Sequence, residues 1–249
     1  MGIFIKNSEQ IEFMRKANRI VAETHELLER SVRPGITTAE LNGIADDFIR
    51  SKNAIPSFLG YRGFPASACV SVNEEVIHGI PGLKRLKEGD IVSIDIGAIY
   101  AGFHGDAART HPVGHVSPEL KRLMDVTKSS FFEGIRFARQ NAHLHEISAA
   151  IQDYVEENGF SVVRDYIGHG IGRKMHEEPE IPNFRQKKRG PRLYPGMTLA
   201  IEPMVNMGTY EVEILSDNWT VVTLDGKCSA HYENTILITD GEPEILSIC

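Results

Sequence analysis

Two aspartates stand inside an apolar stretch of the sequence, IVSIDIGAIYAGFHGDAAR, at residues 91–109. The stretch is typical of a β-hairpin, with Asp95 in its first strand and Asp106 in its second. A buried carboxylate without a partner is costly, so these side chains either face water or share a cation. Both are equally far from a turn centred between Tyr100 and Ala101. This spacing predicts that the two carboxylates face each other across the hairpin.

A segment similar to the one around Asp95 occurs again in the second half of the chain. The segment EGDIVSID, which ends at Asp95, aligns with PGMTLAIE, which ends at Glu202, at an offset of 107 residues. A helix-like segment at 35–49 aligns with 141–155 at an offset of 106 residues. Two separate segments with nearly the same offset indicate that the chain contains a duplicated half.

The duplication predicts a cluster of four carboxylates, because each half supplies one acid per strand. The triplet HGD, which ends at Asp106, corresponds to HYE, which ends at Glu233. Four such groups in an apolar setting cannot all stay ionised without cations. Two divalent ions would balance the four charges, and carboxylates that bridge metals about 3.5–4 Å apart form a recurrent hydrolytic centre. We therefore interpret Asp95, Asp106, Glu202 and Glu233 as metal ligands.

A fifth ligand is expected from a histidine in the segment YIGHGIGRKMHEEP, residues 166–179. Glycines flank His169, and they would let the backbone come close to a small bound species. His176 begins the string HEEPE, which is not HExxH, so a thermolysin-like zinc site is excluded. Four carboxylates and one imidazole suit Mn(II), Fe(II), Co(II) or Zn(II), and the sequence does not choose among them.

The elements that must position these side chains are helix pairs followed by hairpins, twice over. Capping signals and apolar spacing predict helices over about 8–31, 38–49, 118–135 and 144–158. Strands are expected at 68–72, 91–97, 105–113, 198–205, 219–224 and 232–239. This order favours an α+β fold over an alternating α/β fold. The remaining histidines of interest are expected outside the site, with His111 and His115 in a loop and His143 and His145 on the surface.

Composition limits the function classes. The chain has 249 residues, 41% hydrophobic, and a formal net charge of -7, which argues against a dedicated nucleic-acid binder. The basic segment RQKKRGPR, residues 185–192, is interpreted as a solvated loop. No apolar run is long enough to cross a membrane, and the N-terminal residues lack a secretory signal. The cysteines are far apart and form no zinc or disulfide pattern, so the cytoplasm is the expected location.

Several motifs together resemble the type I methionine aminopeptidases of bacterial type, from the first helix to the last strand. These motifs are NEEVIHGIP (73–81), DIGAIYAGFHGD (95–106), GHGIGRKMHEEP (168–179), IEPM (201–204) and YENT (232–235). The resemblance implies the pita-bread fold, an α+β fold of two pseudo-twofold-related halves around a central antiparallel sheet. It also implies one catalytic domain over residues 1–249, with half-repeats of about 1–115 and 116–249.

The resemblance implies roles for individual residues. The metal ligands would be Asp95, Asp106, His169, Glu202 and Glu233, with Asp106 and Glu233 bridging two ions. His78 would meet the substrate amide beyond the first residue, and His176 would hydrogen-bond the scissile carbonyl and its developing oxyanion. Glu202 would in addition act as general base to the attacking water and then as proton donor to the leaving amine.

The resemblance also implies an apolar pocket for a methionine side chain. Its lining would be Phe58, Tyr61, Phe64, Cys69, Met175 and Trp219. Some family members carry cysteine where Phe58 stands and an aromatic residue near Met175, so the shape of the pocket departs from theirs while its apolar character remains. No zinc-binding extension precedes the catalytic region, which is expected of a compact, bacterial-type enzyme.

The implied activity is removal of the initiator methionine from nascent polypeptides whose second residue is small, with two divalent ions (Mn, Fe(II), Co or Zn) per chain. The implied partners are the N-termini of nascent chains, with docking at the ribosome left open, for a monomer that binds neither nucleic acid nor membrane. Two alternatives stay open. One is an X-Pro peptidase on the same fold, whose relatives normally carry an N-terminal domain. The other is a metal-free binding homologue, which would be expected to have lost ligands.

Overall fold

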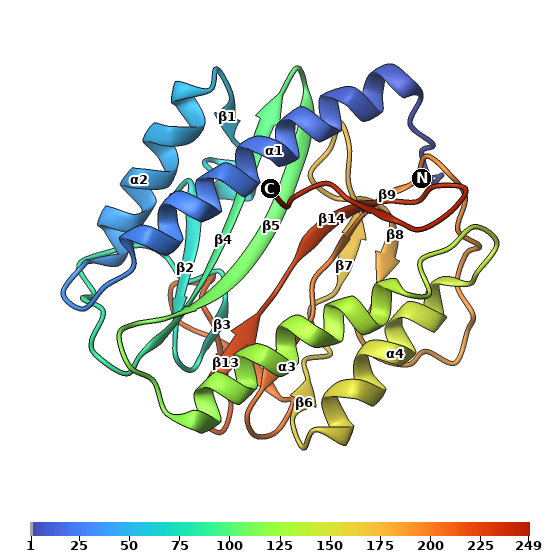
Figure 1. Cartoon of the computed structure of the whole chain (residues 1–249). Helices are drawn as coiled ribbons and strands as arrows, with labels where there is room; N and C mark the ends of the chain where they lie inside the picture. Colours follow the sequence, from blue (N-terminus) through green and yellow to red (C-terminus); the bar gives the residue numbers. More distant parts are fainter. Residues whose placement is uncertain (1) are drawn as a thin grey trace.

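The computed structural model describes residues 2–249. In this part of the chain, four α-helices lie in front of a layer of short antiparallel sheets (Figure 1). The helices are α1 (Ser8–Ser31), α2 (Thr38–Ser51), α3 (Pro118–Ile135) and α4 (Leu144–Glu157), and a single 3-10 turn covers Tyr61–Gly63. The strands are β1 (Ile55–Pro56), β2 (Ala68–Val72), β3 (Glu75–Ile77), β4 (Ile91–Tyr100), β5 (Phe103–Pro112), β6 (Ser161–Val162), β7 (Gly168–Gly170), β8 (Glu177–Ile181), β9 (Thr198–Ile201), β10 (Met204–Asn206), β11 (Val212–Ile214), β12 (Val221–Thr223), β13 (Ser229–His231), β14 (Asn234–Leu237) and β15 (Glu244–Ile245).

Helices α1, α2 and α3 begin where their capping residues predict, and α4 begins at Leu144, as expected from its apolar spacing. The Asn7 side chain accepts from the backbone N–H of Gln10 at the start of α1. Thr37 and Glu40 form a capping box at the start of α2, and Ser117 caps α3 with Pro118 in its first turn. These side chains satisfy backbone N–H groups that a helix end leaves free. The predicted helices are therefore confirmed to within a few residues.

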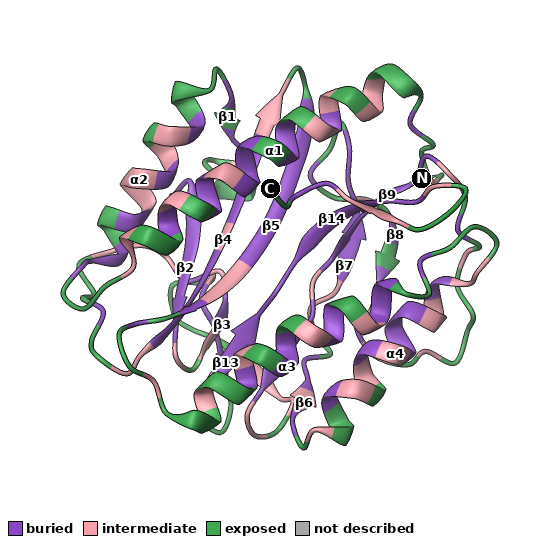
Figure 2. Ribbon diagram, in the orientation of Figure 1, coloured by how far each residue is buried: buried purple, intermediate pink, exposed green. Residues whose placement is uncertain are grey.

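The strands form four small antiparallel sheets in the described residues. Their orders are β1-β4-β2 with β5 on β4, β15-β14-β9-β7-β8, β13-β10-β6, and β11-β12-β3. Helix α1 packs against β4 and β5 and α2 against β1 and β2, whereas α3 packs against β13 and β10 and α4 against β6 (Figure 1). Apolar side chains of α3 and α4 also pack with those of β9 and β14. Most strands are buried, and the helices turn their buried sides toward them (Figure 2). The α+β class is confirmed.

Backbone conformations recur at the offset of the sequence repeat. Gly89 has a φ of 91° two residues before β4, and Gly196 has a φ of 89° two residues before β9. Gly35 (φ 88°) and Asn141 (φ 70°) take the left-handed conformation shortly before the second helix of each pair. Gly and Asn are the residues that adopt this conformation most easily. The backbone therefore takes the same conformation at two pairs of positions that the sequence offset relates.

The register of the β4–β5 hairpin differs from the prediction. The turn consists of Ala101 and Gly102, both with positive φ, so Tyr100 pairs with Phe103. Asp95 therefore pairs with Ala108, and Asp106 pairs with Gly97. The two aspartates are diagonal neighbours on one face of the hairpin rather than directly opposed. The prediction that they face each other was wrong, because the turn is centred one residue later in the chain than predicted. A two-residue turn is favoured there because its backbone matches the twist of the strands.

Three other predictions need correction. The strand expected at 198–205 breaks after Ile201, because Pro203 has no N–H for the ladder and the chain moves from the sheet of β9 to that of β10. The strand expected to start at Tyr232 begins at Asn234. His111 lies buried in β5 as the partner of Val92 rather than in a loop.

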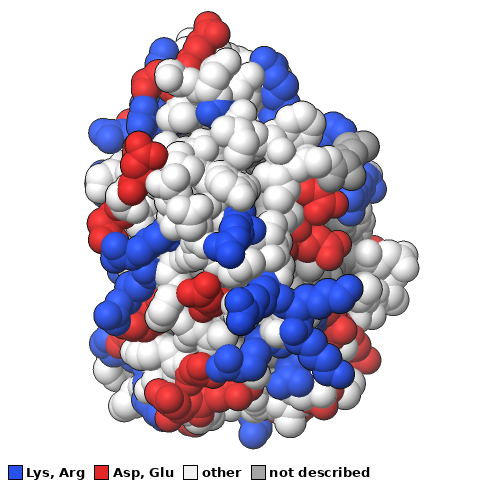
Figure 3. Space-filling model, turned by 90° about the vertical axis from the view of Figure 1, so that its right-hand side faces the viewer, with Lys and Arg blue, Asp and Glu red and all other residues white. Residues whose placement is uncertain are grey.

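The basic segment at residues 185–192 is a largely exposed loop beside α4, as expected. Arg185 pairs with Asp153 of α4, and the His143 and His145 rings, half-buried at the start of α4, bond carbonyl oxygens of the same loop. Figure 3 shows the face that lies on the right-hand side of the molecule in Figure 1. Lys and Arg side chains gather on the lower part of this face. Among the described helices, none is both long and apolar enough to cross a membrane.

Candidate active site

The four predicted carboxylates come from two pairs of strands that meet between the halves. Asp95 lies on β4 and Asp106 on β5, whereas Glu202 and Glu233 occupy the breaks after β9 and before β14. Backbone contacts hold the halves together at this point. The Glu233 N–H donates to the carbonyl of Ala108 at 2.9 Å. The Thr235 hydroxyl donates to the carbonyl of Asp106 at 2.9 Å.

His169 joins this cluster from β7. Its Nε2 lies 3.7 Å from Asp106 Oδ2 and 3.6 Å from Glu202 Oε1. Ligand atoms of Asp106, His169 and Glu233 all lie within 4.8 Å of one another. The Nδ1 of His169 is 2.9 Å from the carbonyl of Gly170, which leaves the lone pair on Nε2 when Nδ1 carries the proton. The imidazole is therefore oriented as a ligand.

The glycines beside His169 serve the sheet rather than a bound species. A Cβ at Gly168 would lie 2.4 Å from the carbonyl oxygen of Ala200, and one at Gly170 would lie 2.2 Å from that of Glu178. Both positions require glycine because neighbouring backbone passes too close for a side chain. The sequence interpretation identified the right residues but gave the wrong reason.

The carboxylates repel one another strongly in the metal-free chain. Burial raises the pKa of Asp95 to about 7. Burial, together with the charge of Asp95 and other acids of the cluster, holds the pKa values of Asp106, Glu202 and Glu233 well above their usual range. Burial also lowers the pKa of His169 to about 3. The His169 contacts in the metal-free chain are therefore contacts of neutral groups rather than ion pairs.

Unpartnered oxygen atoms mark the space between these groups. Asp95 Oδ1, Asp106 Oδ1 and Glu233 Oε1 are buried and have no hydrogen-bond partner. A buried acceptor without a partner costs about 1–3 kcal/mol. Cations among the carboxylates would satisfy these atoms and keep the acids ionised. The cluster therefore fits divalent metal.

A cavity of about 150 Å³ opens beside the cluster. All of the site residues expected from the sequence line it: Phe58, Tyr61, Phe64, Cys69, His78, Asp95, Asp106, His169, Met175, His176, Glu202, Trp219 and Glu233. One wall is made of the carboxylates and His169, and the other is apolar. The structure thus brings the predicted residues together from both halves of the chain.

His176 is held by an aromatic neighbour. Its Nδ1 lies 2.8 Å from the Tyr61 hydroxyl, and the two rings stack with centroids 5.4 Å apart. When the Tyr61 hydroxyl donates to Nδ1, the proton of the neutral imidazole lies on Nε2, the nitrogen left to donate to a substrate. The His176 ring also lies 4.2 Å from that of His169, measured between centroids. His176 is therefore a fixed hydrogen-bond donor next to the cluster.

His78 stands on the opposite side, in a left-handed backbone conformation with φ of 57°. Its ring makes edge contacts with Tyr166 and Trp219, at centroid distances of 5.8 and 6.3 Å. Burial lowers the pKa of His78 to about 4, so the ring is neutral at physiological pH. Trp219 in turn packs edge-on against Phe64. These contacts fix the far wall of the cavity.

Sequence reasoning missed part of the lining and its support. Arg62, Ile77, Tyr166 and Ile167 also line the cavity. Tyr166 and Ile167 stand in the segment that contains His169, so their nearness to it in the sequence could have predicted them as lining residues. Nothing in the sequence marked Arg62 or Ile77 in this way.

Arg109 is a second residue that the sequence did not single out. Its side chain is partly buried and donates to the Glu233 carbonyl, to Asn234 Oδ1 at 2.6 Å and to the Ser247 carbonyl at 3.0 Å. The guanidinium of a first-half strand thus satisfies acceptors of the second half. It holds the backbone on which Glu233 stands.

A sequence model of metallopeptidase family M24 matches residues 12–240. This match covers most of the chain and includes the four carboxylates, His78, His169 and His176. The fold and the buried cluster are thus those of a metallopeptidase, a hydrolase that uses divalent metal.

Relatives that match over the full chain indicate which kind of metallopeptidase this is. The chain is 58% identical to the methionine aminopeptidase of Clostridium acetobutylicum and 59% identical to that of Clostridium perfringens, with 99% of each chain covered. The crystal structure of methionine aminopeptidase from Thermotoga maritima superposes with a TM-score of 0.98 at 44% identity, covering both chains fully. The chain therefore belongs to the methionine aminopeptidases of metallopeptidase family M24. The resemblance read from the sequence and the pita-bread fold are confirmed.

A more distant structure shares the fold alone. The Xaa-Pro dipeptidase from Bacillus anthracis superposes with a TM-score of 0.80 at 24% identity. The match covers 98% of this chain but 61% of the dipeptidase. The scaffold is therefore common to more than one kind of peptidase.

Proposed function

We propose that this chain removes the N-terminal methionine from new polypeptides and peptides whose second residue is small. The observation that carries the proposal is the cavity itself, which places a buried carboxylate cluster against an apolar wall. The cluster suits hydrolysis, and the wall suits an apolar side chain. The full-length relatives named methionine aminopeptidases support the same activity.

Two divalent ions would be held by Asp95, Asp106, His169, Glu202 and Glu233. The orphaned carboxyl oxygens and the free Nε2 of His169 support this set of ligands. When bound, the ions would lower the pKa of a water between them toward neutrality and polarise the scissile carbonyl. Oxygen-rich ligands with one imidazole suit Mn(II), Fe(II), Co(II) or Zn(II).

The protein's own groups would handle the proton and the developing charge. Glu202 would take a proton from the attacking water and pass it to the leaving amine, a task that suits a buried carboxyl group. The Nε2–H of His176, oriented by Tyr61, would donate to the oxyanion. His78 would contact the substrate amide beyond the first residue. Each role rests on the position of the side chain at the edge of the cavity.

The apolar wall would select methionine and the region around His78 would select the second residue. Phe58, Phe64, Cys69, Met175 and Trp219, together with the Tyr61 ring, offer polarisable surface that suits a thioether. His78 and its aromatic neighbours leave little room beside the metals for a large second side chain.

Peptide cleavage tests this proposal. With Mn²⁺ added, we expect release of methionine from Met-Ala-Ser and no cleavage of Gly-Pro. Met-Gly peptides should be cut far faster than Met-Lys peptides, and similar rates would contradict the steric role of His78. Cleavage of Gly-Pro in place of Met-Ala-Ser would favour the X-Pro alternative. Failure of Mn²⁺ to raise either the melting temperature or the activity would favour a metal-free binding protein.

We further propose that the enzyme acts as a monomer in the cytoplasm, where nascent chains carry their initiator methionine, and that it meets them at the ribosome without binding nucleic acid itself. Light scattering and co-sedimentation with translating ribosomes would test these points. One catalytic domain over residues 1–249, with half-repeats near 1–115 and 116–249, stays a prediction that a single unfolding transition would support.

A further inference from the structure

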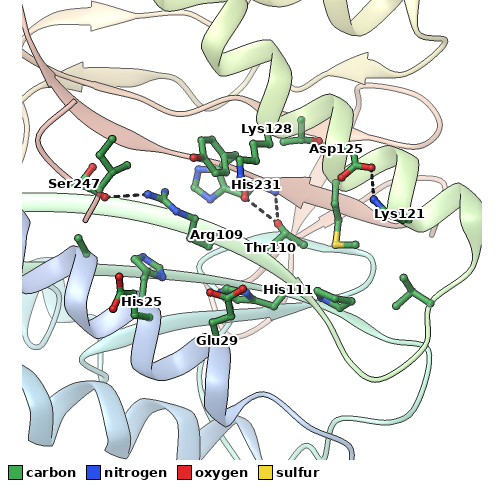
Figure 4. A pocket seen from close by; sticks show the side chains of 18 of the residues that line it. His25, Glu29, Arg109, Thr110, His111, Lys121, Asp125, Lys128, His231 and Ser247 are labelled. Atoms are coloured by element: carbon green, nitrogen blue, oxygen red, sulfur yellow. Dashed lines mark hydrogen bonds and ion pairs between the residues drawn. The ribbon is translucent and has the colours of Figure 1, made fainter. Parts of the chain in front are cut away.

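His231 occupies the wall between the proposed metal site and a second cavity behind it. This rear cavity has a volume of about 680 Å³ and opens between α1 and α3. Figure 4 shows His231 on its wall, next to Arg109 and Thr110. On the other side, His231 Nε2 lies 4.0 Å from Glu202 Oε2. His231 is thus a rear-cavity side chain that reaches a carboxylate of the proposed metal site.

The backbone of His231 is fixed, whereas its Nε2 has no partner. The His231 N–H donates to the Thr110 hydroxyl at 2.8 Å, and that hydroxyl donates to the His231 carbonyl at 2.9 Å (Figure 4). The side chain is almost completely buried, and Nε2 makes no hydrogen bond. Leaving such a group unpaired costs about 1–3 kcal/mol, so a buried orphan calls for a partner that the metal-free chain does not supply.

Glu202 is the group that can become this partner. Its carboxylate lies between two imidazoles, with Oε1 facing His169 and Oε2 facing His231. An ionised Glu202 would be a much stronger acceptor for an N–H donor on the His231 side. A small movement would turn the 4.0 Å contact into a hydrogen bond.

We propose that His231 is a positioning residue that donates from Nε2 to Glu202 and holds this carboxylate in the orientation that binds metal. The inference rests on the proposed metal-dependent function. It concerns only the orientation of Glu202, and His231 itself need not touch metal or substrate. Groups that orient metal ligands from behind typically change metal affinity or activity about 10–100-fold when removed.

The test compares His231→Leu with His231→Gln, because glutamine keeps a neutral N–H donor and leucine does not. Metal-free protein is titrated with Mn²⁺ by calorimetry, and kcat and KM for Met-Ala-Ser are measured separately. We expect His231→Leu to weaken Mn²⁺ binding and to lower kcat, each about 10–100-fold, with KM changed about twofold at most. His231→Gln should recover both to within about threefold of the unaltered chain.

His111→Leu provides the matched control. His111 lies on the neighbouring β5, lines the same cavity and also has a buried Nε2 without a hydrogen-bond partner, whereas the 4.0 Å contact with Glu202 belongs to His231. We expect it to change the melting temperature and to leave Mn²⁺ affinity unchanged. Equal affinities for the leucine and glutamine variants of His231, or an equal loss in His111→Leu, would overturn the proposal. If the unaltered chain binds Mn²⁺ but leaves Met-Ala-Ser intact, the proposed function fails while the effect of His231 on affinity can still be measured.

Discussion

The two halves of the molecule place equivalent acids in different backbone settings. In the first half, Asp95 and Asp106 stand inside two continuous strands of ten residues that form one hairpin. In the second half, Glu202 and Glu233 stand in breaks, where the chain leaves one sheet and enters another. The first half thus supplies its two acids to the cluster from a regular ladder, and the second half supplies its two acids from interrupted strands.

The difference in backbone accompanies a difference in side-chain length. A regular antiparallel ladder puts diagonal neighbours within reach of short side chains, which suits aspartate. At the breaks, Pro203 and the change of sheet turn the backbone away from the ladder, and glutamate has one more methylene with which to reach the cluster. We expect the regular ladder of the first half to tolerate a change in side-chain length less well than the breaks of the second half.

The largest expected effect comes from removing a bridging acid in either half. Asp106→Asn and Glu233→Gln should each lower kcat by roughly 10³-fold or more, because a neutral amide can neither bridge two cations nor balance their charge. Steady-state kinetics with added Mn²⁺ measures this loss.

Metal-free stability supplies the control for these two variants. Both should unfold at the same or a higher temperature than the unaltered metal-free chain at about pH 8, since each removes a crowded carboxylate. Activity near the normal level in either variant would contradict the bridging role.

A smaller effect should follow from exchanging side-chain lengths between the halves. Asp95→Glu should weaken Mn²⁺ binding about 10–100-fold, whereas Glu202→Asp, at a position outside the ladder, should weaken it less. Calorimetric titration of the metal-free variants measures both affinities. Equal losses in the two variants would show that the backbone difference has no bearing on the site.

The pH dependence of stability should change sign with metal. In the metal-free chain the folded state binds a proton at Asp95 more tightly than the unfolded state does, so the stability that this group contributes is lost as pH rises toward about 7, its pKa. The other three acids, whose pKa values are also raised, extend this loss to higher pH. Between about pH 8.5 and pH 6.5 the free energy of unfolding should therefore increase as pH falls.

Two controls bound this effect. Below about pH 6.5 the buried histidines, whose pKa values burial lowers, should reverse the trend as the unfolded state takes up protons. With saturating Mn²⁺ the acids stay ionised, so the gain between about pH 8.5 and pH 6.5 should disappear. Urea denaturation at each pH measures the free energy of unfolding with and without Mn²⁺. An identical increase in the two cases would contradict the proposal that these acids bind the metal.

The smallest effect concerns the equivalent helix starts. Thr37 caps α2 through its hydroxyl, whereas His143 at the start of α4 has no side-chain cap of this kind. Thr37→Ala should cost about 1 kcal/mol of stability, and His143→Ala only a few tenths. Equal losses in thermal unfolding would indicate that the two starts are stabilised in the same way.

Local signals in the sequence were enough for much of the fold. Asn7, Thr37 and Ser117 each mark a helix start within their own segment, so the helices could be predicted. The hairpin register could not be predicted, because the turn places Ala101 in a positive-φ conformation. Alanine disfavours this conformation, so its presence in the sequence does not indicate a turn at this position. The breaks at Glu202 and Glu233 depend on a change of sheet, which is set by distant strands.

The same distinction holds for the site. The repeat and the motifs located the carboxylates, His169 and the apolar wall, because spacing along the chain was informative there. The contact of His231 with Glu202 and the bonds of Arg109 to the second half join residues that carry no common pattern in the sequence. Such contacts arise only when the halves pack together.

Anomalous diffraction from crystals grown with Mn²⁺ tests the central claim most directly. It would locate every ion and identify its neighbours. We expect two peaks between the halves, within bonding distance of Asp95, Asp106, His169, Glu202 and Glu233. A map with no peak at this place, or with ions bound only elsewhere on the molecule, would contradict the account.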